Sequence, residues 1–208
     1  WFLDRPHAGK TADIGAGIRV PTYVSGPSSH GWWAAVITLV VAGMVAALMG
    51  FSYVFLWSRS PDQWAPPPEL GSMALVLAGY AAAAGLAWAS CRALRLERPR
   101  SGMIATLLMV VAAALIVGSL GADVQAWIGT GLRPTVHAQG ATVYALLAWQ
   151  AWFAVIVAIM GFYIVLRWLA GHMQADRPTT GDIIALFIVY AATQGTFFTL
   201  LVRLFPGV

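Results

Sequence analysis

Charged residues are scarce in this sequence. Only 10% of its 208 residues are Asp, Glu, Lys or Arg, whereas about 25% is usual for a soluble domain. The single cysteine, Cys91, excludes an intrachain disulfide. So few charges cannot solvate a water-exposed surface, and 60% of the residues are hydrophobic with a mean hydropathy of +0.75. The composition therefore predicts an integral membrane protein.

Signatures of catalysis and of cofactor binding are lacking as well. A buried haem needs axial ligands inside the bundle, usually histidine, but no histidine falls in the middle of an apolar run. The sequence has no Cys/His cluster with zinc or copper spacing, and no nucleotide-binding loop, serine triad or nucleophile elbow. We therefore expect no redox metal and no catalytic residue in this chain. The four histidines are His7, His30, His137 and His172.

Five apolar runs are each long enough to cross about 30 Å of hydrocarbon as a helix. The sequence thus predicts an all-α membrane protein, with a polar tail or linker over residues 1–30 and a five-helix domain over 31–208. Small residues such as Gly79 and Ser119 favour close packing of the second and third helices. The expected spans are about Trp32–Trp57, Leu70–Ala93, Met103–Ile128, Ala141–Leu169 and Asp182–Leu204.

The basic residues are unevenly distributed between the two sides of this predicted bundle. Cytoplasmic segments carry an excess of Lys and Arg, so the bias predicts a cytoplasmic N-terminus and a periplasmic C-terminus. One side holds Arg5, Lys10, Arg19, Arg92, Arg95, Arg98, Arg100, Arg167 and Arg177, and the other holds Arg59, Arg133 and Arg203. Because topology explains the net charge of +4, we expect no nucleic-acid partner.

Aromatic and basic residues near the span ends are candidate contacts to lipid headgroups. Tryptophan is enriched at membrane interfaces, and each Arg near an anionic surface contributes about 1 kcal/mol of attraction. Topology alone would also put the arginines there. These candidates are Trp32, Trp33, Arg92, Arg95, Arg98 and Arg100.

A few polar residues fall inside the predicted spans, where ionisable groups are functional candidates by default. Asp123 lies late in the third span and could be either a structural partner or a functional group. Gln125, Gln150 and Gln194 are best explained by interhelical hydrogen bonds. Asp182 is expected in the first turn of the last helix, near its positive end.

Several stretches resemble subunit III of the haem-copper cytochrome c oxidases, and most of all the C-terminal part of bacterial polypeptides in which subunits I and III are fused. Ser29–Val36 leads into the first span, which ends Phe51-Ser52-Tyr53-Val54-Phe55-Leu56-Trp57 and is followed by Trp64-Ala65-Pro66-Pro67. The tail Asp13–Ile18 with Pro21-Thr22 resembles the joining region of the fused form. The segment His137–Tyr144 with Trp149-Gln150-Ala151 resembles a later helix of that form.

This resemblance implies the last five of the seven subunit III helices, and a chain beginning at Trp1 fits a piece of a fused polypeptide. It implies a non-catalytic module of a terminal oxidase that reduces oxygen and pumps protons, with subunits I and II as partners and cytochrome c reached through the complex. Haem and copper would lie in those partner subunits, and this chain would bind phospholipid. The sequence departs from the family at Val40–Gly43, which lacks the usual carboxylate, and at Gln150–Phe153, which replaces His-Gly-x-His.

Two other interpretations stay open. One is a related subunit III-like component of a quinol oxidase or of a nitric oxide reductase. The other is a small transporter, which usually needs an inverted repeat and polar groups converging at the midplane. Five spans cannot divide into equal halves, so the oxidase module is the leading hypothesis.

Overall fold

The computed structural model describes residues 11–13, 15–21, 30–96, 100–173 and 178–205. Five helices in this part are long and apolar enough to cross a membrane, as the sequence predicted. Their bounds are α1 His30–Arg59, α2 Leu70–Leu94, α3 Ser101–Gly129, α4 Ala138–Leu169 and α5 Thr179–Leu204. Each bound lies within three residues of the expected one, because the helices continue a short way beyond the apolar residues into the interface.

A short hairpin precedes the bundle. Strands β1 (Thr11–Asp13) and β2 (Arg19–Pro21) pair antiparallel, with Ala12 opposite Val20. Gly15 and Gly17 in the turn both have positive φ values, which glycine adopts without steric cost. The tail expected over residues 1–30 thus contains this hairpin and the first residue of α1.

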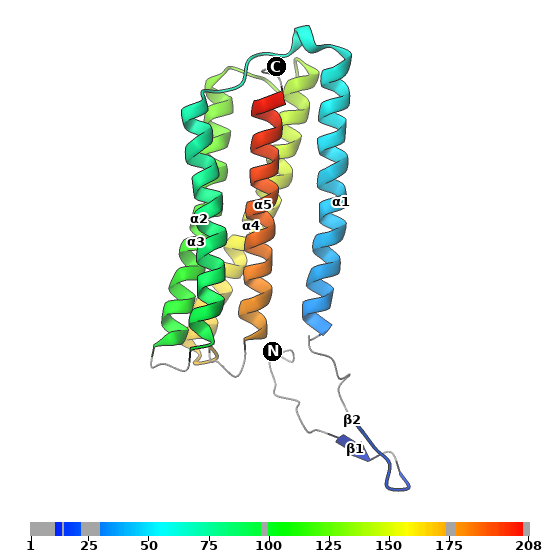
Figure 1. Ribbon diagram of the computed structural model, residues 1–208, viewed down its shortest axis with the longest axis vertical. Coiled ribbons are helices and arrows are strands. Elements are labelled where there is room, and N and C mark those ends of the chain that lie inside the picture. Colours follow the sequence, from blue (N-terminus) through cyan, green and yellow to red (C-terminus); the bar gives the residue numbers. More distant parts are fainter. Residues whose placement is uncertain (1–10, 14, 22–29, 97–99, 174–177, 206–208) are drawn as a thin grey trace.

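Helix α5 is the central helix of the bundle (Figure 1). In its most apolar stretch 56% of the residues are buried, against 22–44% for the other four helices. Helices α2 and α3 form the most extensive pair, and α1 packs against α4 and α5. Ser119 of α3 lies where a side chain on Gly79 of α2 would be, so the small residues do allow the close approach that the sequence predicted.

The outward surfaces of the helices are apolar. On α1 the exposed side chains include Ile37, Met44, Leu48 and Phe51, each more than 60% exposed. A soluble monomer rarely leaves a continuous apolar surface of this kind in water. Together with the five spans, this surface shows a multi-pass membrane protein.

The two ends of the bundle differ in composition. At one end, residues 60–69 join α1 to α2 and contain Pro61, a 3-10 turn over Pro61–Gln63, and Pro66–Pro68. We call this segment the proline loop and this end the proline end; it is the upper end in Figure 1. The opposite end, which we call the arginine end, holds Arg92, Arg95 and Arg100 at the junction of α2 and α3.

Candidate functional site

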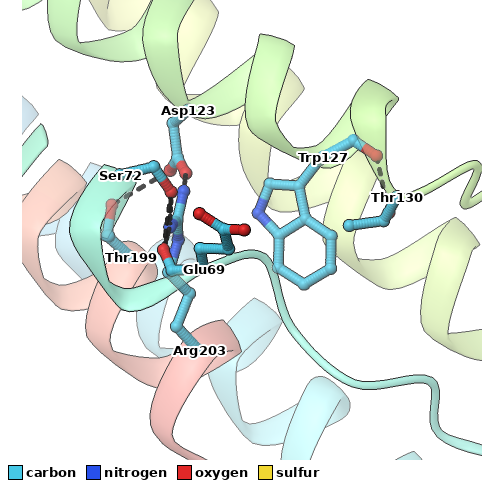
Figure 2. A network of polar contacts seen from close by, with 7 residues as sticks. All are labelled: Glu69, Ser72, Asp123, Trp127, Thr130, Thr199 and Arg203. Carbon is cyan, nitrogen blue, oxygen red and sulfur yellow. Dashed lines mark hydrogen bonds and ion pairs between the residues drawn. The ribbon is translucent and has the colours of Figure 1, made fainter.

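A buried ion pair joins α3 to α5 near the proline end (Figure 2). Arg203 Nη2 lies 2.5 Å from Asp123 Oδ1, and the two side chains are 0% and 3% exposed. The Thr199 hydroxyl donates to Asp123 Oδ2 at 3.0 Å. Arg203 Nη1 donates to Ser72 Oγ at 2.6 Å and to the Glu69 carbonyl at 3.3 Å. We call these five residues the Asp123–Arg203 cluster.

The topology brings this cluster together. Helices α3 and α5 run in the same direction and both end at the proline end, so Asp123 and Arg203 lie at the same depth. Thr199 and Arg203 are four residues apart, which puts both side chains on one face of α5. Helix α2 begins at this end and supplies Ser72 in its first turn. The cluster therefore links three helices through charge-assisted hydrogen bonds.

A second polar network lies nearer the middle of the bundle. Gln194 Nε2 donates to Gln150 Oε1 at 2.8 Å, and Gln150 Nε2 donates to the Ala191 carbonyl at 2.9 Å. The Tyr190 hydroxyl donates to Gln194 Oε1 at 2.8 Å. Gly195 allows this approach, because a β-carbon there would lie 2.8 Å from Gln150 Nε2. The network joins α4 to α5, as the sequence predicted for Gln150 and Gln194.

The proline loop is held by side chains from α4 and α1. Gln139 of α4 bonds both backbone groups of Ala65: its Nε2 donates to the carbonyl at 2.9 Å and its Oε1 accepts from the N–H at 2.8 Å. Trp64 Nε1 donates to the Tyr53 hydroxyl of α1 at 3.1 Å. That hydroxyl donates to the Val202 carbonyl of α5 at 3.4 Å. The loop is therefore fixed on the bundle.

A pocket of about 520 Å³ lies between the proline loop and the end of α3. A smaller groove of about 250 Å³ lies between α1 and α5 and is almost entirely apolar. The larger pocket is lined by Ala65, Pro66, Pro67, Pro68, Glu69, Ser72, Ala126, Gly129 and Thr130.

The arginine end carries a more exposed set of contacts. Arg95 Nη2 forms an ion pair with Asp182 at 3.0 Å, and the side chains are 63% and 26% exposed. The Arg92 guanidinium lies 4.7 Å from the Trp88 ring centre. Asp182 is in the first turn of α5, as expected.

The remaining candidate headgroup contacts belong to the same end of the bundle. The rings of Trp32 and Trp33 meet edge to face at 5.1 Å at the start of α1. Arg100 is exposed, whereas Arg98 lies outside the described residues. Contact of this group with lipid headgroups stays a prediction.

The sequence predicts some of these residues and gives no sign of others. The sequence leaves open whether Asp123 is a structural partner or a functional group. The structure pairs it with Arg203, which from the sequence counts only as a charge outside the bundle. Gln125 is exposed on α3, outside both polar networks. Gln139, buried at the start of α4, was also missed. One feature of the sequence does indicate that Asp123 and Arg203 could pair. The expected topology puts both residues late in spans that run in the same direction.

The described residues contain no group of three or more His, Cys, Asp and Glu side chains that could hold a metal ion. Absence of haem and copper from the whole chain stays a prediction. No protein-family model matches this chain, and no curated protein matches it either.

Proposed function

We propose that this chain is a non-catalytic, subunit III-like module of a respiratory terminal oxidase in a bacterial inner membrane. It would stabilise subunit I, to which it could be fused, and hold phospholipid at the edge of the complex. Haem and copper would belong to subunits I and II, and cytochrome c would deliver electrons to the complex.

One observation carries this proposal: two sequence stretches that resemble the oxidase family meet in space. The stretch ending in Trp64-Ala65-Pro66-Pro67 and the stretch His137–Tyr144 are far apart in the chain. Gln139 of the second stretch nevertheless bonds both backbone groups of Ala65 in the first. Gly140 follows it and packs directly against the Arg133 carbonyl, which leaves no room for a side chain. Two of the stretches that carry the resemblance thus meet at the proline end.

The polar interior also supports a scaffold role. The Asp123–Arg203 pair and the Gln150–Gln194 pair each join two helices. A guanidinium does not deprotonate in proteins, and truncating either member of a buried pair is strongly destabilising. Groups used in this way hold a bundle rigid, as a module that supports a larger subunit requires.

We further propose that the arginine end faces the cytoplasm. One arginine at each end, Arg167 and Arg203, is buried in the bundle, so neither acts as a loop charge. The bias of the other basic residues toward the arginine end persists, and it favours a cytoplasmic N-terminus. Cysteine-accessibility labelling of single-cysteine variants at Asp62 and at Arg100 would test this orientation.

The proposal is tested by gentle purification of this chain from its native membrane with its partners attached. We expect larger subunits in stoichiometric amount and a haem signal in the reduced-minus-oxidised visible spectrum. Oxygen consumption with reduced cytochrome c, compared with a quinol, would separate the cytochrome oxidase from the quinol oxidase alternative. A colourless, monodisperse protein without partners would refute the oxidase role.

A second experiment addresses the supporting role itself. Removing this chain from the purified complex should leave initial turnover in place while shortening the active lifetime and lowering the lipid content. The complex reconstituted with the chain is the matched control. If the depleted complex keeps its full lifetime and its lipid, the supporting role is wrong.

A further inference from the structure

We draw no further inference here: the strongest candidate, the apolar groove of about 250 Å³ between α1 and α5 that Gly43, Ala46 and Phe197 help to line, carries none because nothing in the structure shows what covers it.

Discussion

Replacing Asp123 with alanine should destabilise the bundle more than any other single truncation of a carboxylate in the described part of the chain. Among the described residues, the substitution removes the only carboxylate that pairs with Arg203, whose side chain is 0% exposed. The guanidinium would keep Ser72 and the Glu69 carbonyl as neutral acceptors, but its charge would be uncompensated. Leaving one member of a buried pair without its partner costs about 3–5 kcal/mol.

The size of this effect can be checked against a matched pair at the opposite end. Asp182 also pairs with an arginine, Arg95, at 3.0 Å, but those side chains are 26% and 63% exposed. Exposed pairs typically contribute about 0–1 kcal/mol. Asp182→Ala should therefore cost a small fraction of what Asp123→Ala costs, although both remove an Asp–Arg ion pair.

A double-mutant cycle separates the ion pair from simple loss of packing. Replacing Arg203 with methionine in the Asp123→Ala background removes the uncompensated charge. The double variant should therefore be more stable than Asp123→Ala alone, so the two costs should fall short of additivity by about 2–3 kcal/mol. Additive costs would mean that Asp123 and Arg203 do not interact energetically.

The assay is unfolding by SDS in mixed micelles, followed by circular dichroism, with the free energy of unfolding extrapolated to zero SDS. Gln125→Ala on the exposed side of α3 gives the background cost of a substitution in that helix. The reasoning is refuted if Asp123→Ala is no more destabilising than Gln125→Ala or Asp182→Ala.

Three further predictions concern the other contacts, and the same unfolding assay measures the first two. Gln150→Leu should cost about 1–2 kcal/mol, because it removes the partner of Gln194 in the bundle interior; an unchanged free energy would show that the bond contributes nothing. Gly195→Val should cost about 1–3 kcal/mol by overpacking, since a β-carbon there would lie 2.5 Å from the Tyr80 ring. Its control is Gly85→Ala, which meets open space and should be neutral apart from helix propensity. Gln139→Leu should leave the Ala65 backbone unpaired and cost about 1–3 kcal/mol. Faster proteolytic cleavage of the proline loop in proteoliposomes would report that the loop is released from the bundle. Cleavage at the wild-type rate would contradict this prediction.

The helices could be predicted closely from the sequence, whereas their polar partners could not. Length and apolarity determine a span, so the bounds of α2 differ from the expectation by one residue. A partner depends on which helices are neighbours and on how each is rotated about its axis. Gln125 and Asp123 are two residues apart in α3, yet one is exposed and the other is buried. Nearly uniform apolarity around each helix leaves no amphipathic pattern from which that rotation could be read.

The most informative difference between prediction and structure is the place of Arg203. Counting it as a loop charge was reasonable, because a basic residue at the end of a span normally extends to the interface. Here the last turn of α5 is at the centre of the bundle, so the side chain meets Asp123 and the start of α2 before it meets water. The polar contacts that result are concentrated at the proline end, where Gln139, Trp64 and Tyr53 also hold the loop. At the arginine end the ion pair of Arg95 stays exposed. The contacts at the proline end hold the proline loop on the bundle, and this is the end at which two of the stretches that resemble the oxidase family meet.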